Sequence, residues 1–190
     1  MKLVLASTSP QRRAILEQLR IPFDVVAPEY EERDPPDADP VELVRAHAEG
    51  KARSVHDEGA VTLGVDTIVH LDGRLYGKPE DEGGASTMVG ELAGATHLVV
   101  SGLCLLGPGF SVVEHAVTRV TFRELGVSEI DAYIATGEWR GRAGGYAIQG
   151  IGGRLVAGIE GDYLNVVGLP AALLVDVLSA KAPKLLQIRS

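Results

Sequence analysis

The 190-residue chain is poor in cysteine, in aromatic residues and in positive charge. Cys104 is its one cysteine, so no internal disulfide can form, which is typical of a protein of a reduced, cytoplasmic compartment. Its 18 Lys and Arg residues face 26 Asp and Glu residues, a net charge of −8. That balance argues against a general nucleic-acid-binding protein, because binding a phosphate polymer requires a basic surface. A small phosphate-bearing ligand met by a few local cations stays open.

Two further absences exclude membrane insertion and zinc chemistry. No apolar run approaches the roughly 20 residues of a membrane span, and residues 1–7 turn polar too early for a signal peptide. The histidines have no metal-ligand spacing, and Cys104 lies in an apolar stretch, so neither a zinc site nor a cysteine nucleophile is supported. The five histidines are His47, His56, His70, His97 and His115.

Helical and strand patterns alternate along the chain, which predicts an α/β fold with a mixed sheet. Ser9 is expected to cap the first helix, with Pro10 as its first residue, and Ser128 to cap a later one. An acidic linker and a solvated tail complete the pattern; the tail holds Lys181, Lys184 and Arg189. Strands are predicted over 2–6, 23–27, 61–71, 74–76, 97–106, 111–123, 146–148, 154–159 and 163–167, helices over 11–19, 41–55, 81–92, 128–136 and 170–178, and the linker over 28–40.

The turn at 7–13, between the first strand and the first helix, is a candidate anion site. Backbone N–H groups at a helix N-terminus bind anions, and Ser7, Ser9 and Arg12 would add donors for phosphate oxygens. A capped helix with solvated arginines is the more common meaning of such a turn taken alone.

Asp66 interrupts a strand that is otherwise apolar. A carboxylate buried among β-branched residues costs several kcal/mol unless it is paired, bound to a metal or placed at the mouth of the strand. Strand ends in α/β sheets are also where ligands bind. The sequence therefore favours a functional Asp66 over a carboxylate that only caps a turn.

Several other polar residues have both an ordinary and a functional interpretation. Lys51 lies on an amphipathic helix and Lys78 lies between Gly77 and Pro79; each alone is most often a surface lysine. Gln149 is surrounded by five glycines over 144–153, either a flexible loop or a surface on which an amide reads a nucleobase edge. The acidic linker is by default solvated, although Glu31 and Glu32 are possible Mg²⁺ ligands.

Taken together, these segments resemble the Maf family of nucleoside triphosphate pyrophosphatases. The resemblance rests on LASTSP at 5–10, VDT at 65–67, GKPED at 77–81, YAIQG at 146–150 and IEGDYLNVVGLP at 159–170. These motifs follow the family order over nearly the whole chain. One position departs from it: the family usually has Ser-x-Ser-Pro-Arg-Arg, and here Gln11 replaces the first arginine, at a position linked to the choice of base.

The resemblance implies a single domain over 1–190, an elongated mixed β-sheet with flanking helices and two lobes around a central cleft, and a cytoplasmic homodimer. It implies hydrolysis of dTTP and UTP, with modified pyrimidine nucleotides as a further option, to the monophosphate and pyrophosphate. A divalent cation, Mg²⁺ or Mn²⁺, is the implied cofactor. In this interpretation Ser7, Ser9, Arg12, Lys51, Lys78 and Gln149 bind substrate, Asp66 accepts the proton of water, Gln11, Thr67 and Gln149 set specificity, and Glu31, Glu32 and Asp66 hold the metal.

Two alternatives stay open from the sequence. A non-catalytic nucleotide-binding regulator of septum formation would need the cationic residues but not Asp66. A pyrophosphatase for deaminated purine (inosine or xanthosine) triphosphates would share the architecture but lack the Ile148-Gln149-Gly150 loop.

Overall fold

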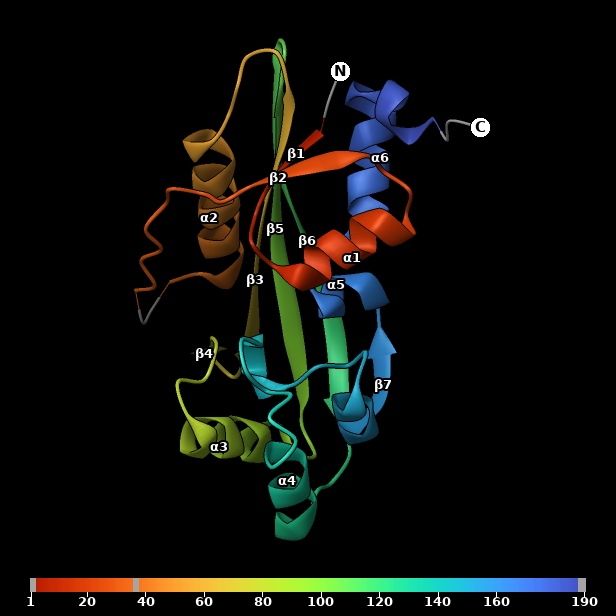
Figure 1. The fold of residues 1–190 in the computed structure, drawn as a ribbon. Helices are drawn as coiled ribbons and strands as arrows, with labels where there is room; N and C mark the ends of the chain where they lie inside the picture. The colour runs from red at the N-terminus through yellow and green to blue at the C-terminus, as the bar shows by residue number, and fades with distance from the viewer. Residues whose placement is uncertain (1–2, 36–37, 188–190) are drawn as a thin grey trace. The chain divides into compact units, whose positions relative to one another are not determined.

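Helices and strands alternate through the protein, which we describe from a computed structural model covering residues 3–35 and 38–187 (Figure 1). The strands are β1 Leu3–Ala6, β2 Phe23–Val26, β3 Val61–Leu71, β4 Arg74–Tyr76, β5 Thr96–Gly107, β6 Phe110–Phe122 and β7 Val156–Glu160. The helices are α1 Pro10–Gln18, α2 Pro40–Ser54, α3 Glu82–Leu92, α4 Val127–Ile134, α5 Tyr163–Val167 and α6 Ala171–Lys181, with short 3₁₀ segments η1 Ala143–Gly145, η2 Ile151–Leu155 and η3 Pro183–Leu186. None of the described helices has the length and apolar character needed to cross a membrane.

The strands form one mixed sheet in the order β2-β1-β3-β5-β6-β7, and β4 pairs with β3. β1 runs parallel to both of its neighbours, whereas β4 pairs antiparallel with β3 and β7 antiparallel with β6. A mixed sheet with flanking helices confirms the predicted fold class.

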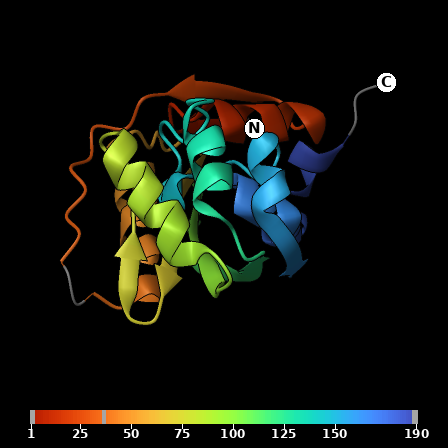
Figure 2. The same ribbon diagram turned by 90° about the horizontal axis from the view of Figure 1, so that it is seen from below.

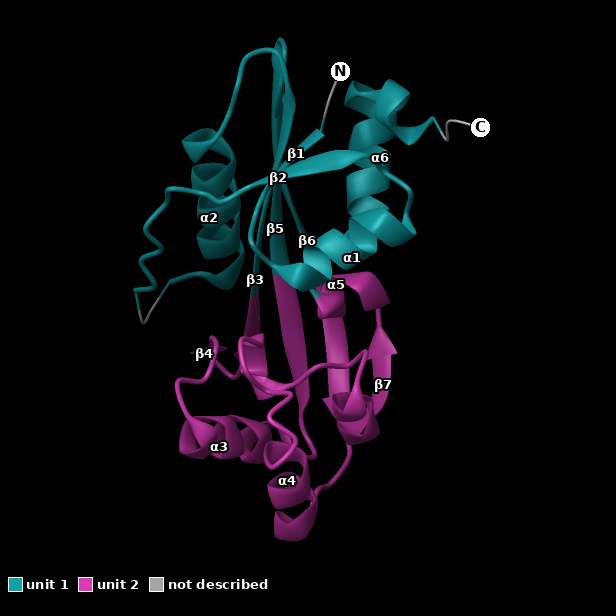
Figure 3. Cartoon of the chain, viewed as in Figure 1, with its two compact units in different colours: residues 1–67, 101–116, 168–190 teal, residues 68–100, 117–167 magenta. Residues whose placement is uncertain are grey.

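The chain divides into two compact units, shown in Figure 3. Unit 1 comprises residues 1–67, 101–116 and 168–190, and unit 2 comprises residues 68–100 and 117–167. Each of β3, β5 and β6 contributes residues to both units. The prediction of one domain over 1–190 stays a prediction.

In unit 1, α2 lies against β3 and β5 on one side of the sheet, and α1 and α6 lie on the other (Figure 1). α2 presents its small residues Ala48 and Ala52 to Cys104, all fully buried. Its backbone comes so close that a methyl group on Gly64 of β3 or Gly102 of β5 would overlap the carbonyls of Ala48 and Val44. The two glycines therefore determine how near α2 lies to the sheet.

Unit 2 has its own core, which is richer in aromatic side chains. Phe122 and Tyr146 pack edge to face, with ring centroids 4.8 Å apart, and the buried His97 lies against both rings. α3 and α4 lie side by side over this unit (Figures 1 and 2). Most predicted elements are confirmed to within one or two residues, including the Ser9 cap of α1 with Pro10 as its first residue.

Two predicted strands are wrong. Residues 146–148 do not form a strand: residues 146 and 147 have no regular structure, and a turn covers 148–150. Gly144 and Gly145 take positive φ angles of 70° and 72° and bend the chain before Tyr146. Residues 163–167 form α5, although they are rich in β-branched and aromatic residues. The carboxylate of Asp162 accepts a hydrogen bond from the N–H of Leu164 at 2.8 Å, and this local bond starts a helical turn.

Two smaller expectations are also corrected. α4 is capped at Gly126 rather than at Ser128, since the Glu129 carboxylate folds back onto the Gly126 N–H at 3.1 Å. In the C-terminal segment Lys181 and Lys184 are exposed as expected, but the segment is not wholly solvated, because Ala182 and Leu185 are buried. Arg189 lies outside the described residues.

Candidate active site

The parallel pairing of β1 with β3 brings two of the sequence motifs to one edge. β1 ends at Ala6, which pairs with Gly64, and β3 continues beyond that point. Asp66 and Thr67 therefore lie past the carboxyl end of β1, next to the turn that starts at Ser7. Ligands of α/β sheets bind at this kind of edge.

The turn after β1 is held by its own side chains. Ser7, only 4% exposed, accepts a hydrogen bond from the Ser9 N–H at 3.2 Å. Ser9 caps α1 by accepting from the Arg12 N–H at 3.5 Å, and its hydroxyl donates to the Gln11 side-chain oxygen at 3.1 Å. The first position of α1 is Pro10, which lacks an N–H. The result is an ordered helix N-terminus with Gln11 tied to the cap.

Arg12 joins this turn to two other segments of unit 1. Its guanidinium donates to the Ser7 hydroxyl at 3.1 Å, to the Thr67 hydroxyl at 3.4 Å and to the Gly168 carbonyl at 3.0 Å. These bonds use three of the five N–H groups of a guanidinium. Burial lowers the pKa of Arg12, while Asp66 and Glu32 nearby favour its charged form. An arginine in such a site stays protonated at neutral pH.

Thr67, predicted to set specificity, is part of the support of Arg12. Its hydroxyl lies 2.9 Å from the Ser101 hydroxyl and 3.4 Å from the Gly168 carbonyl. Through these contacts Thr67, a residue of β3, joins β5 and the segment before α6. The described contacts of Thr67 are therefore those of a residue that positions the guanidinium.

Lys51 and Asp66 form a buried ion pair, and Glu32 adds a second carboxylate to it. The Lys51 ammonium lies 2.6 Å from Asp66 Oδ1 and 2.7 Å from Glu32 Oε1. Lys51 and Asp66 are each 6% exposed, whereas the Glu32 side chain is about half exposed. The close packing of α2 on Gly64 brings the ammonium to the strand. The buried Asp66 is thus paired, as its burial requires.

Glu31 and Glu32, both predicted as metal ligands, take opposite directions. The Glu31 carboxylate lies 3.3 Å from the Arg33 guanidinium, and both side chains are exposed. Glu31 is therefore not brought to Lys51, whereas Glu32 is.

Glu32 and Asp66 suit a hard divalent cation, because Mg²⁺ is commonly held by one or two carboxylates together with substrate phosphates and water. Within residues 3–35 and 38–187, no group of three His, Cys, Asp or Glu side chains is placed to hold a metal ion. Glu32 and Asp66 are therefore the carboxylates beside Lys51 that could contribute oxygen ligands to such a cation.

Lys78 and Gln149, the other predicted substrate-binding residues, belong to unit 2 and are both exposed. Gln149 lies in the turn between η1 and η2. Glu138 holds that turn by accepting hydrogen bonds from the Ile151 N–H at 3.0 Å and the Gly152 N–H at 2.8 Å. A side chain at Gly150 would overlap the Glu138 carboxylate and would displace it from its present position.

The buried side of the same turn is held by tyrosines. The Tyr133 hydroxyl accepts from the Ala147 N–H at 3.1 Å, and burial raises the pKa of Tyr133 to about 12. The Tyr146 hydroxyl lies 2.9 Å from Nε2 of His97, and burial lowers the pKa of His97 to about 4. Both tyrosines and the histidine are therefore neutral at pH 7.

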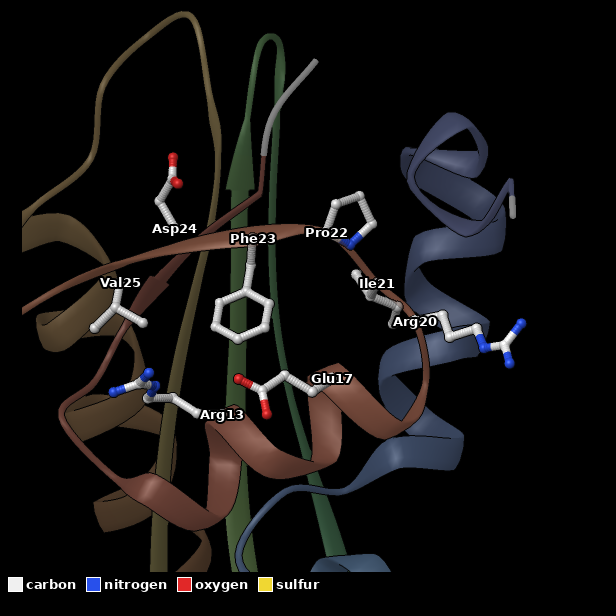
Figure 4. Close-up of a pocket in the computed structure, with 8 residues that line it drawn as sticks. All are labelled: Arg13, Glu17, Arg20, Ile21, Pro22, Phe23, Asp24 and Val25. Atoms are coloured by element: carbon white, nitrogen blue, oxygen red, sulfur yellow. The ribbon is translucent and has the colours of Figure 1, made fainter. Parts of the chain in front are cut away.

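A surface hollow between α1 and β2 does not include any of these residues (Figure 4). Arg13 and Glu17 of α1 point into it below Phe23 of β2. Arg13, the neighbour of Arg12 along the chain, is exposed and faces this hollow. The helix thus separates two adjacent arginines, one bonded into the candidate site and one outside it.

Comparison with known proteins assigns a family. The family described as Maf-like protein matches residues 2–181 of the chain. The chain belongs to the Maf-like protein family. Among its relatives, a "dTTP/UTP pyrophosphatase" of Symbiobacterium thermophilum is 44% identical over 94% of this chain and 93% of its own length. Another protein of that name, from Nitratidesulfovibrio vulgaris, is 45% identical over 92% of this chain and 85% of its own.

A third relative with the same name comes from Thermococcus gammatolerans, is 46% identical and matches 90% of this Maf-like chain and 92% of its own. Among solved structures, the Staphylococcus aureus Ham1 protein overlaps 64% of this chain and 72% of its own. That likeness has a TM-score of 0.41 and 11% identity, which is too low to support an argument.

Several supporting residues of this Maf-like chain were not predicted from its sequence. They are Ser101 beside Thr67, Glu138 and Tyr133 under the Gln149 turn, and Tyr30 and His47 beside Glu32. Each is a common polar or aromatic residue in a stretch without a motif, so no local pattern marks it. Of these contacts, only the approach of Glu138 to the turn has a sequence signal, the glycine at position 150.

Proposed function

We propose that this chain is a nucleoside triphosphate pyrophosphatase that hydrolyses dTTP and UTP to the monophosphate and pyrophosphate. The observation that carries the proposal is the buried Lys51–Asp66 pair with Glu32 at its side, in a chain more than 40% identical to proteins named for this activity. The site supplies fixed positive charge, paired carboxylates and a helix N-terminus, the parts that phosphate-transfer chemistry needs.

Arg12 and Lys51 are the proposed phosphate-binding cations in unit 1. Hydrolysis between the α and β phosphates moves negative charge onto the leaving pyrophosphate, and fixed cations stabilise that charge. Arg12 is oriented by Ser7, Thr67 and Gly168, so its remaining N–H groups meet phosphate oxygens without first being ordered. Lys78 is the corresponding proposed cation of unit 2.

Asp66 is the proposed proton acceptor for the attacking water. Its Oδ1 is bonded to Lys51, and the second oxygen of an ionised carboxylate is a further acceptor. Lys51 keeps the carboxylate in one orientation, so a water bonded to Asp66 is presented in a fixed direction. Loss of its proton to Asp66 makes that water a stronger nucleophile.

A divalent cation, Mg²⁺ or Mn²⁺, is part of the proposal, and Glu32 and Asp66 are the residues that would hold it. When bound, such a cation polarises phosphate oxygens and screens the charge of the triphosphate. The role of the protein is to keep the two carboxylates together, which Lys51 does by contacting both.

Gln149 is the proposed base-reading residue. Its amide has a donor side, the NH₂ group, and an acceptor side, the carbonyl, which match the carbonyl and N3–H groups of uracil or thymine. Cytosine presents the reverse pattern at N3 and N4 and should be disfavoured unless the amide flips. Gln11 and Thr67 are the remaining proposed specificity positions, and Gln11→Arg is expected to narrow the range of bases, because a guanidinium only donates.

A homodimer in the cytoplasm is also part of the proposal, and light scattering of the purified protein tests the oligomeric state. The activity is tested by incubating the protein with UTP, dTTP, CTP and purine triphosphates, with Mg²⁺ or Mn²⁺, and measuring pyrophosphate. Pyrophosphate from UTP and dTTP in excess over the others supports the proposal. Binding without turnover would favour a nucleotide-binding regulator, and preference for inosine or xanthosine triphosphate a purine enzyme; either result overturns the proposal.

A further inference from the structure

The acidic segment at 29–34 lies along α2, and its successive side chains point alternately toward the helix and away from it. Its even-numbered residues contact the helix: Tyr30 and Asp34 contact His47, and Glu32 contacts Lys51. Between them, Glu31 and Arg33 are exposed and pair with each other. An extended chain sends successive side chains to opposite sides, so residues two apart share a side. The segment is therefore attached to His47 both before and after Glu32.

Tyr30, His47 and Asp34 form a hydrogen-bonded chain on that side. His47 is 2% exposed; its Nδ1 lies 3.1 Å from the Tyr30 hydroxyl and its Nε2 lies 2.8 Å from Asp34 Oδ1. A carboxylate only accepts, so Nε2 carries the proton and donates to Asp34. In the neutral ring Nδ1 then accepts from the Tyr30 hydroxyl.

The Tyr30 ring also sits directly on the backbone of α2. A methyl group on Gly50 would overlap the ring, so the absence of a side chain at this position admits the tyrosine. Gly50 is next to Lys51 in the helix. The ring thus lies against Gly50 and its hydroxyl against His47, and both positions precede Lys51, the residue that pairs with Glu32.

We propose that Tyr30, His47 and Asp34 are positioning residues that hold the Glu32 carboxylate beside Asp66, and so assemble the divalent-cation site before substrate arrives. This inference rests on the proposed function, because it assigns a role toward the cation of that reaction. Glu32 is half exposed and belongs to a segment without helix or strand structure. Its position therefore depends on the contacts made by its neighbours. Partners of this kind behind metal ligands typically contribute about 10- to 100-fold in metal affinity.

The test is Mn²⁺ binding to the purified full chain, measured as the loss of the free Mn²⁺ signal in electron paramagnetic resonance. Tyr30→Phe removes one hydroxyl, and Asp34→Ala removes the acceptor of His47; both are expected to weaken Mn²⁺ binding by about 10- to 100-fold. Gly50→Ala, which favours the helix but displaces the Tyr30 ring, is expected to act in the same direction.

Two controls separate positioning from charge. Asp34→Asn removes the same charge as Asp34→Ala but keeps an oxygen that accepts from His47 Nε2. Its Mn²⁺ affinity should therefore be closer to that of the wild type than to that of Asp34→Ala. Glu31→Gln removes a charge from the outward side of the same segment and should leave Mn²⁺ affinity unchanged. Equal loss in Asp34→Asn and Asp34→Ala would overturn the positioning role in favour of simple charge.

Substitution of the proposed metal ligand itself, Glu32→Gln, separates the positioning role from the metal assignment. If Glu32→Gln weakens Mn²⁺ binding while Tyr30→Phe and Asp34→Ala bind as the wild type does, the positioning role is wrong and the proposed function stands. If the wild type does not bind Mn²⁺, or Glu32→Gln has no effect, the metal assignment fails and this inference fails with it. The pyrophosphate measurement then judges the proposed activity separately.

Discussion

The two units of this Maf-like chain place functional residues in different ways. In unit 1, Lys51 and Asp66 are buried charges that hold each other, and Arg12 is oriented by three oxygen atoms. In unit 2, Lys78 and Gln149 are exposed, and the contacts that organise the Gln149 turn are made by its backbone. The first arrangement fixes side chains and the second fixes a loop.

This difference matches the chemistry that each unit is proposed to do. Stabilising charge and accepting a proton require groups whose orientation costs nothing at the moment of reaction. Reading a base requires an amide that meets a ligand edge, and a firm backbone under an exposed side chain is sufficient for that. We therefore expect substitutions in unit 1 to lower turnover for every base, and substitutions around the Gln149 turn to change base choice or loop stability.

The largest effect is expected from Asp66→Asn, which removes the proton acceptor while keeping the shape of the side chain. Activity toward UTP should fall by about 10²- to 10⁴-fold, the usual contribution of a positioned base. Asp72→Asn, the same change in the exposed turn after β3, is the matched control and should leave the rate of pyrophosphate release unchanged. Steady-state rates of pyrophosphate release measure both, and wild-type turnover in Asp66→Asn would remove this residue from the mechanism.

The buried His97 of unit 2 should make stability depend on pH. Burial lowers its pKa in the folded chain from the ordinary 6.5 to about 4. Between these two pH values the histidine is protonated in the unfolded chain and neutral in the folded chain. The contribution of the neutral His97 to the free energy of unfolding is therefore fully present above pH 6.5 and is lost as the pH falls toward 4. This pKa difference of about 2.5 between the unfolded and folded chain corresponds to about 3 kcal/mol of unfolding free energy.

Urea unfolding of the wild type and of His97→Gln at about pH 7.5 and about pH 4.5, on either side of the ordinary histidine pKa, checks this pH dependence. The glutamine variant keeps a polar group near the Tyr146 hydroxyl but has no proton to gain. The difference in unfolding free energy between the two proteins should shrink or reverse at the lower pH. A difference that stays constant with pH would show that His97 titrates alike in both states.

Arg12→Ala should reduce kcat/KM for all triphosphates, because a charge-assisted contact contributes about 1.5–3 kcal/mol, or roughly 10- to 150-fold. Arg13→Ala is the matched control on the same helix, since that side chain faces the hollow of Figure 4. The pair is compared with UTP and with CTP. Equal losses in the two variants would mean that the phosphate site is not on the Ser7 side of α1.

Tyr133→Phe should have the smallest effect and should be confined to unit 2. It leaves the Ala147 N–H without its acceptor, which costs about 1–3 kcal/mol in a buried site. Thermal unfolding measures that loss. Turnover of UTP under saturating conditions should stay close to the wild type; a loss as large as that of Arg12→Ala would contradict the division between the two units.

Much of the fold could be predicted because local and global preferences agree. The hairpin of β3 and β4 follows from the Asp72-Gly73 turn after a long run of strand-forming residues, and α1 follows from Ser9 and Pro10. The failures at 146–148 and 163–167 have one physical cause: short apolar runs carry no period, and turn glycines or a capping Asp162 decide the outcome.

The candidate site was predictable in its residues but not in its connections. The burial of Asp66 implied a partner, yet only the close packing of α2 on Gly64 shows that the partner is Lys51. The choice between Glu31 and Glu32 likewise depended on the register of an extended segment. Contacts across long sequence separations, such as Thr67 with Ser101, leave no trace in local pattern.

The ratio of kcat/KM for UTP to that for CTP, measured in the wild type, in Asp66→Asn and in Gln149→Ala, tests the account most directly. Asp66→Asn should lower both values by the same factor and leave the ratio intact. Gln149→Ala should move the ratio toward one while sparing more of the turnover, because a polar site rejects ligands that leave its groups unpaired. A ratio that changes in Asp66→Asn and holds in Gln149→Ala would contradict it.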